Sequence, residues 1–199
     1  MQLTNPKKFG EVLAFLAGDA LFLDHFGMIA ASALPDEVKV SLILELSDAS
    51  GSRGMVAGQV LDMEGEHKQL TLAELQTIHA NKTGCLLAYP FIAAGLSLEL
   101  QADIAQLLEK IGKTLGLAFQ VRDDILDLVA DFEALGKTPQ KDLVAEKSTY
   151  PALLGLEESK ALLTSELDAC EDLLDQITAA CDFDPQAIKK LIEGLRIDG

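Results

Sequence analysis

Apolar residues recur along most of this chain at the three- and four-residue spacing of amphipathic helices. The strict alternation that marks β-strands occurs nowhere, so we predict an all-α protein. The predicted helices run from Asn5-Pro6 to just before Pro35, from Asp36 to the Ser- and Gly-rich stretch 48–54, from Met55 to about Glu66, from Thr71 towards Pro90, over about 99–129, from Pro151 through Ile177, and from Asp184-Pro185 to Leu195.

Three of these helices carry more specific expectations. Asn5 should cap the first, with Pro6 at its first position. The sequence Thr71-Leu72-Ala73-Glu74 has the form of a capping box, and Pro90 predicts a kink or a break. The helix over about 99–129 is long for a globular protein, so we expect it to be central and covered on several sides.

Length and composition indicate a single folded domain over residues 1–199. Hydrophobic residues make up 49% of the chain, and 199 residues can bury a sizeable core. The stretch 48–54 is too short to be a domain linker. The formal net charge of −16 disfavours nucleic acid and anionic membranes as partners and favours metal cations.

The location of the protein is predicted from its N-terminus and its cysteines. Acidic residues interrupt the first apolar region, which argues against a signal peptide, and no stretch approaches about 18 apolar residues. The three cysteines, Cys85, Cys170 and Cys181, are an odd number without CxxC spacing, so we interpret them as buried free thiols. We therefore predict a soluble, cytoplasmic protein with no membrane-spanning helix.

The most informative segment is an acidic cluster, Asp123, Asp124 and Asp127, in the longest predicted helix. Asp123 and Asp127 are four residues apart and so share one helix face, where like charges cost a few tenths of a kcal/mol. An apolar helix that carries such a cluster suggests a bound hard cation such as Mg²⁺. A solvated acidic patch without a ligand is the simpler alternative, and the cluster alone does not decide between them.

Basic and polar residues near the cluster suggest that the other ligand is a diphosphate. Three lysines follow it within a short stretch (Lys137, Lys141 and Lys147), and Lys82-Thr83 lies in another apolar helix. A lysine there could also simply extend its ammonium group to water. Gln59 and Asp62 are neighbours on one helix beside Gly58, which helix packing alone would also explain.

Seven motifs in their order along the chain resemble the trans-isoprenyl diphosphate synthases, most of all those of the bacterial farnesyl diphosphate synthase type. The motifs are Lys7-Lys8-Phe9-Gly10-Glu11, Leu16-Ala17-Gly18-Asp19-Ala20-Leu21, Gly58-Gln59-x-x-Asp62, Lys82-Thr83-Gly84, Phe119-Gln120-x-x-Asp123-Asp124-x-x-Asp127, Gly136-Lys137 and Lys147-Ser148-Thr149-Tyr150-Pro151. The resemblance covers essentially the whole chain.

The resemblance implies an isoprenoid-synthase-type helical bundle around a deep cavity. It implies a prenyltransferase, which uses Mg²⁺ to condense isopentenyl diphosphate with an allylic diphosphate. Its implied site residues are, for metal, Asp123, Asp124 and Asp127; for the allylic diphosphate, Lys82, Lys137 and Lys147; beside the reacting carbons, Thr83 and Gln120; near isopentenyl diphosphate, Phe119; and among the other substrate-binding residues, Gln59 and Asp62.

One departure from the family pattern is large. The family carries a first aspartate-rich motif, an arginine pair and isopentenyl diphosphate anchors upstream of the Lys7–Gly10 segment, and this chain shows none of them. We therefore expect it to match only the C-terminal part of the family. Two hypotheses follow: a synthase, expected to be a homodimer or to pair with an intact subunit, or a non-catalytic helical protein that binds diphosphate or pairs with a full-length subunit.

Overall fold

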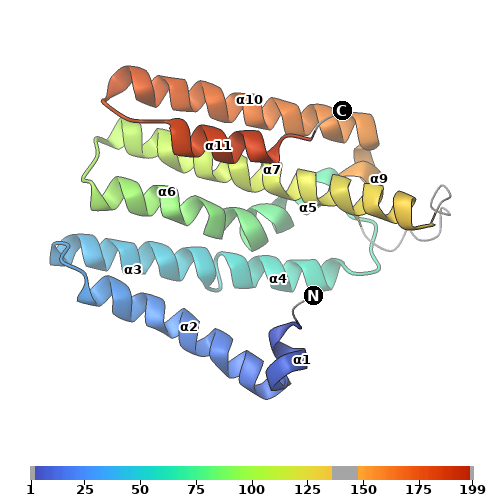
Figure 1. Ribbon diagram of the computed structural model, residues 1–199, viewed down its shortest axis with the longest axis horizontal. Coiled ribbons are helices and arrows are strands. Elements are labelled where there is room, and N and C mark those ends of the chain that lie inside the picture. The colour runs from blue at the N-terminus through green and yellow to red at the C-terminus, as the bar shows by residue number, and fades with distance from the viewer. Residues whose placement is uncertain (1–2, 136–147, 198–199) are drawn as a thin grey trace. The chain divides into compact units, whose positions relative to one another are not determined.

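The computed structural model describes residues 3–135 and 148–197, and all regular elements within these ranges are helices (Figure 1). The prediction of an all-α fold is therefore confirmed. The chain divides into two compact units, residues 1–44 and residues 45–199. The single domain predicted over 1–199 stays a prediction.

The first unit contains α1 (Asn5–Phe9), α2 (Glu11–Ala31) and the beginning of α3 (Asp36–Ser50). The prediction of one helix up to Pro35 is wrong, because Gly10 has a φ of +89° and separates α1 from α2. Glycine adopts this backbone region without a side-chain penalty. The cap of α1 is Thr4 rather than Asn5, and its side chain makes no capping hydrogen bond.

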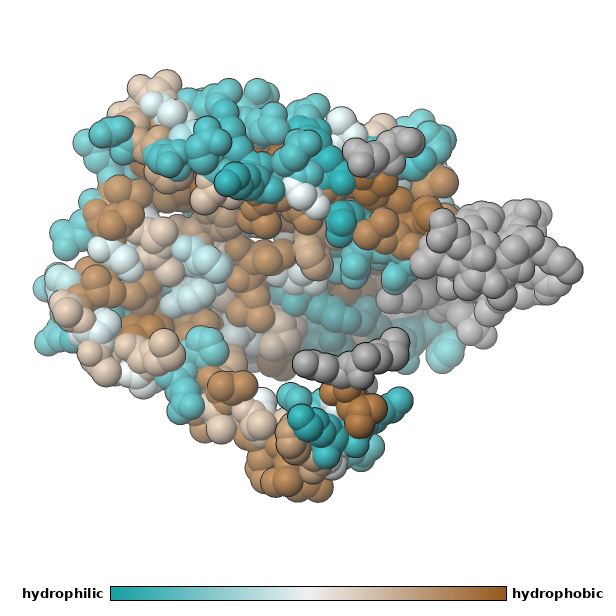
Figure 2. Space-filling view, viewed as in Figure 1, coloured by the Kyte–Doolittle hydropathy of each residue, from teal (hydrophilic) through white to brown (hydrophobic). Residues whose placement is uncertain are grey.

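Helix α2 exposes most of its large apolar side chains. Phe15 is 78% exposed, and Figure 2 shows apolar residues at the surface over α1 and α2. Among the described residues, α2 is the one helix that is long and apolar enough to cross a bilayer. Asp19 and Asp24 interrupt its apolar residues, and the absence of a membrane-spanning helix stays a prediction. The core helices of proteins without a membrane can meet the same criterion, so α2 alone is weak support for a span.

The second unit holds the end of α3 and the elements that build the candidate site (Figure 1). They are α4 (Met55–Gly65), α5 (Leu72–His79), the π-helix η1 (Ala80–Gly84), α6 (Cys85–Ser97), α7 (Ala102–Leu135), α9 (Tyr150–Leu154), α10 (Leu156–Ala180) and α11 (Gln186–Leu195).

Helix α7 is the centre of the second unit, with α6 on one side and α10 on the other (Figure 1). Its inward residues Ile111, Ala118, Val121 and Ile125 are all 0% exposed, because α7 is packed against both neighbours. The prediction of one long central helix is confirmed, although the helix begins at Ala102 and extends beyond 129. The acidic cluster lies on its C-terminal half.

The predicted helix that begins at Thr71 is irregular at Ala80–Gly84, and not at Pro90 as predicted. The capping box is confirmed, since the Glu74 N–H donates to Thr71 Oγ1 and the Thr71 N–H donates to Glu74 Oε2 at 2.8 Å. The change comes at η1, where the Cys85 N–H donates to the Ala80 carbonyl. The chain stays helical through Pro90, so the predicted break there is wrong.

Glycines allow η1 to approach α4 and α7 at backbone distance. A Cβ added at Gly58 of α4 would lie 2.1 Å from the Lys82 backbone nitrogen, and one at Gly116 of α7 would lie 2.7 Å from Gly84 Cα. Any larger residue at these points would push η1 away. Gly58 and Gly116 therefore fix the position of Lys82 and Thr83.

We expect Gly116→Ala to lower the free energy of unfolding by about 1–3 kcal/mol, because the added methyl group has no space beside Gly84. Gly194→Ala is the matched control, since nothing lies within 4 Å of a Cβ at this position in α11. The control should raise stability by up to about 1 kcal/mol through helix propensity. Urea unfolding measures both. A stable Gly116→Ala protein would contradict the close packing of η1 against α7.

The cysteines match the predicted buried thiols only in part. Cys170 is buried, Cys85 is half-buried and Cys181 is exposed, and none forms a disulfide. Burial raises the pKa of Cys170 to about 12 and also raises the pKa of Cys85. Both thiols are therefore protonated and unreactive at neutral pH. The prediction that Cys181 is buried is wrong.

Candidate functional site

The first part of the site is an ion pair between α4 and η1. Lys82 Nζ donates to Asp62 Oδ2 at 2.5 Å, and both side chains are partly buried. Asp62 lies one helical turn after Gly58, the residue that lets the backbone of Lys82 come close. Two residues of the Gly58-Gln59-x-x-Asp62 motif thus have separate roles. Gly58 leaves space for the backbone of η1, and Asp62 binds the Lys82 ammonium group. Gln59 lies beside Gly58 and is half-buried.

The second part is a chain of hydrogen bonds from η1 to α7. Thr83 Oγ1 donates to Gln120 Oε1 at 3.3 Å, and Gln120 Nε2 donates to Asp124 Oδ1 at 3.1 Å. Thr83 is 37 residues from Gln120 in the sequence. The close approach of Gly84 to Gly116 brings the two helices near enough for these bonds. Thr83, the residue that follows Lys82, is therefore held against Gln120.

Asp124 also holds the beginning of α9. The Tyr150 N–H donates to Asp124 Oδ2 at 3.0 Å, across 26 residues of sequence. The Asp124 side chain is only 5% exposed. The ring of Tyr150 packs on His79 with 5.4 Å between ring centroids. Burial, followed by the charges of Asp124 and Glu166, raises the pKa of Tyr150 well above its ordinary value, so the phenol stays protonated.

Hydrogen bonds also hold Ser148 and Thr149, the two residues before Tyr150. Ser148 Oγ accepts the Leu70 N–H at 3.1 Å, and Thr149 Oγ1 caps α9 by accepting the Ala152 N–H. Ser148, Thr149 and Tyr150 belong to the motif Lys147-Ser148-Thr149-Tyr150-Pro151, whose structural role was not predicted from the sequence. Its contacts tie the start of α9 to α7 and to the loop before α5.

The other two aspartates of the acidic cluster, Asp123 and Asp127, face solvent. Asp123 and Asp127 are exposed on one side of α7, one turn apart, and Phe119 is 38% exposed. Within the described ranges, no three His, Cys, Asp or Glu residues come together as a metal-binding group. The three aspartates of the cluster therefore do not converge on one point. The exposed pair is separate from the buried Asp124.

The predicted diphosphate-binding lysines Lys137 and Lys147, and also Lys141, lie outside the described residues. Hydrogen bonds thus join five residues of the predicted site, in the pair Lys82–Asp62 and in the chain Thr83–Gln120–Asp124. Asp123 and Asp127 share the helix that carries Gln120 and Asp124.

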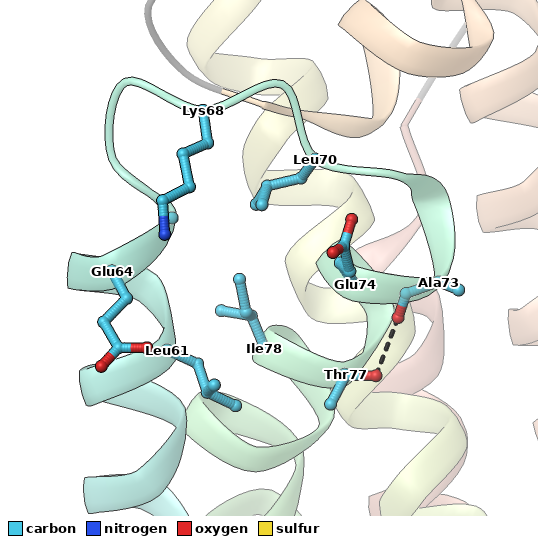
Figure 3. Close-up of a pocket in the computed structure, with 9 residues that line it drawn as sticks. Leu61, Glu64, Lys68, Leu70, Ala73, Glu74, Thr77 and Ile78 are labelled. Carbon is cyan, nitrogen blue, oxygen red and sulfur yellow. Dashed lines mark hydrogen bonds between the residues drawn. The ribbon is translucent and has the colours of Figure 1, made fainter.

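Two pockets lie beside the loop that joins α4 to α5. The one in Figure 3, of about 350 Å³, is formed by α4, this loop and α5, with Leu61, Leu70 and Ile78 around its apolar interior. No predicted site residue lines it. The other, also about 350 Å³, is lined by Asp62 and Ser148 among others. Because Asp62 lines it, this second pocket adjoins the Lys82–Asp62 ion pair.

The all-α fold, the long central helix and the order of these motifs define a member of the polyprenyl synthetase family. The family model matches residues 2–183, so the chain belongs to this family. It is similar to the farnesyl diphosphate synthases of Micrococcus luteus (48% identical over 192 residues, 96% of this chain) and Escherichia coli (40% over 190 residues, 94% of this chain).

A solved structure agrees with these relatives. The geranyltransferase of Helicobacter pylori, complexed with magnesium and isoprenyl diphosphate, superposes with a TM-score of 0.78 at 30% identity over 98% of this chain and 62% of its own. The chain spans 66% of the Micrococcus luteus enzyme and 63% of the Escherichia coli enzyme. It therefore covers somewhat less than two thirds of its relatives.

Proposed function

We propose that this chain takes part in the Mg²⁺-dependent condensation of isopentenyl diphosphate with an allylic diphosphate, as an isoprenyl diphosphate synthase of the farnesyl or geranyl diphosphate type. The observation that carries the proposal is the joined network of η1 and α7. It sets an ammonium group, a hydroxyl and an amide beside a helix with two exposed carboxylates. The family and the named relatives support the same reaction class.

The residues present fit a magnesium ion. Asp123 and Asp127 offer carboxylate oxygens one turn apart on an exposed helix face, which suits a hard cation that keeps several waters and shares its ligands with a phosphate. We propose that these two residues hold the ion. When bound, Mg²⁺ would neutralise charge on the diphosphate leaving group.

The other residues have roles toward the substrate itself. The Lys82 ammonium group would bind diphosphate oxygens by charge-assisted hydrogen bonds, as would Lys137 and Lys147. The Thr83 hydroxyl and the Gln120 carbonyl oxygen would face the allylic carbons, where their dipoles stabilise positive charge. Phe119 and Gln59 would line the substrate site. Asp62 would act on substrate through Lys82, which it contacts directly.

We further propose a soluble, cytoplasmic protein that forms a homodimer or pairs with another synthase subunit. The free cysteines support a reducing compartment. Exposed apolar side chains along α4 (Val56, Val60 and Met63) support a contact with another chain.

The proposal is tested by calorimetric titration of the chain with geranyl diphosphate, with and without Mg²⁺. We expect binding that depends on Mg²⁺. Lys82→Met should weaken it by roughly 10- to 100-fold, since a charged hydrogen bond is worth about 1.5–3 kcal/mol. Lys113→Met is the matched control, because Lys113 is an exposed lysine of α7 that forms an ion pair with Glu109. It should bind as the unchanged chain does.

Two results would count against the proposal. One is the absence of Mg²⁺-dependent binding of geranyl diphosphate by the unchanged chain. The other is an equal loss of affinity in Lys82→Met and Lys113→Met, which would indicate a general effect of charge rather than a site at η1.

A further inference from the structure

Asp124 differs from its two acidic neighbours in its surroundings. It is 5% exposed, whereas Asp123 and Asp127 face solvent. Successive residues of an α-helix point about 100° apart. This rotation carries Asp124 away from the exposed face and toward α9, where it accepts the Tyr150 N–H at 3.0 Å.

We propose that Asp124 is a positioning residue, which fixes the orientation of the Gln120 side-chain amide and the start of α9, rather than a ligand of the metal ion. This inference rests on the proposed function, in which the Gln120 carbonyl faces the allylic carbons. In this proposal the exposed Asp123 and Asp127 bind the metal ion, whereas the buried Asp124 hydrogen-bonds to other residues of the protein.

The first reason is the polarity of the amide. A glutamine amide has an acceptor end and a donor end of nearly the same shape. The donor end of Gln120 faces Asp124, since Nε2 donates to Asp124 Oδ1 at 3.1 Å. The carbonyl oxygen is thereby left toward Thr83, which donates to it at 3.3 Å. A reversed amide would present N–H groups, the wrong polarity for a carbocation.

The second reason is the number of donors. The two carboxylate oxygens of Asp124 accept from different donors: Oδ1 accepts from Gln120 Nε2, and Oδ2 accepts from the Tyr150 N–H. Asparagine has the same shape but only one acceptor oxygen, so it can serve one of these donors and turns N–H groups toward the other. Asp124→Asn is therefore the sharpest variant. This variant replaces one of the two acceptor oxygens by an NH₂ group and hardly changes the volume of the side chain.

The first measurement is Mg²⁺-dependent binding of inorganic diphosphate by calorimetry. We expect Asp124→Asn to change the affinity by less than tenfold, and Asp123→Asn to lose it. If Asp124→Asn loses Mg²⁺-dependent binding as Asp123→Asn does, Asp124 is a metal ligand and the inference is overturned.

The second measurement compares geranyl diphosphate with an analogue that carries an ammonium nitrogen at the position of the developing cation. The unchanged chain should prefer the ammonium analogue, and Asp124→Asn should reduce this preference about tenfold, or about 1.4 kcal/mol. Asp123→Asn should weaken both ligands alike. Gln120→Leu should also remove the preference, and adding Asp124→Asn to it should then have no further effect. A purely structural role of Asp124 would leave the preference unchanged, which would overturn the inference.

The third measurement needs no ligand. NMR hydrogen exchange should be slower at the Gln120 side-chain amide than at Gln106, an exposed glutamine of the same helix, and Asp124→Asn should abolish the difference. Equal exchange in the unchanged chain overturns the inference, even if Asp124→Asn does not fold. If the unchanged chain binds neither ligand, the proposed function fails, and this exchange measurement alone decides whether Asp124 positions Gln120.

Discussion

Replacement of Asp123 by alanine should abolish most Mg²⁺-dependent binding of inorganic diphosphate by this chain. Asp123 and Asp127 are exposed on one side of α7, and removal of either leaves a single carboxylate for the ion. One lost interaction with a charged group is worth roughly 1.5–3 kcal/mol, so the affinity should fall about 10- to 100-fold. Calorimetric titration with diphosphate at fixed Mg²⁺ measures the change.

The control for this experiment is Asp172→Ala, which removes an exposed aspartate of α10 and alters the net charge equally. It should bind diphosphate as the unchanged chain does. Equal binding by Asp123→Ala and the unchanged chain would favour the simpler view that the cluster is a solvated acidic patch. Equal losses in both variants would indicate that net charge, not a site on α7, governs binding.

The 199-residue chain by itself should turn over isopentenyl and geranyl diphosphates far more slowly than an ordinary enzyme does. The sequence contains one aspartate-rich motif, Asp123 to Asp127, whereas the resemblance implies two that act on opposite sides of the allylic diphosphate. A single electrostatic group can contribute about 3 kcal/mol to catalysis, and the absence of several lowers the rate by many orders of magnitude. The advantage of holding two reactants together would be lost as well.

The assay is product formation from both diphosphates with Mg²⁺, with the Micrococcus luteus farnesyl diphosphate synthase as the positive control. A rate of about 1 per second or more from this chain alone would show that one aspartate-rich motif suffices. Binding without turnover is the expected result. It would separate the diphosphate site on η1 and α7 from the complete condensation reaction.

Much of the helical architecture could be predicted from the sequence, because a helix repeats its buried face every three to four residues. The helical pattern over about 99–129 predicted α7 as long and central, and the capping box from Thr71 to Glu74 predicted the start of α5. The failures came from backbone features that such a pattern does not encode. Gly10, with a φ of +89°, interrupts the first predicted helix, and α6 continues through Pro90.

The candidate site could be predicted in composition but not in arrangement. Spacing correctly put Asp123 and Asp127 on one helix face, because four residues nearly complete a turn. Spacing could not reveal that Lys82 pairs with Asp62, since that contact joins α4 to η1. It also gave no sign of the π-helix that carries Lys82 and Thr83.

By itself, the sequence determined the all-α class, the long helix, and the identity and order of the chemical groups. Local periodicity and the short-range geometry of a helix are sufficient for these. Only the tertiary structure decided which groups meet. Asp124 is adjacent to Asp123 in the sequence, yet it turns into the protein to bind Gln120 and Tyr150. The reason is physical: a helix fixes directions around its own axis, whereas the partner in each direction depends on which helix is packed there.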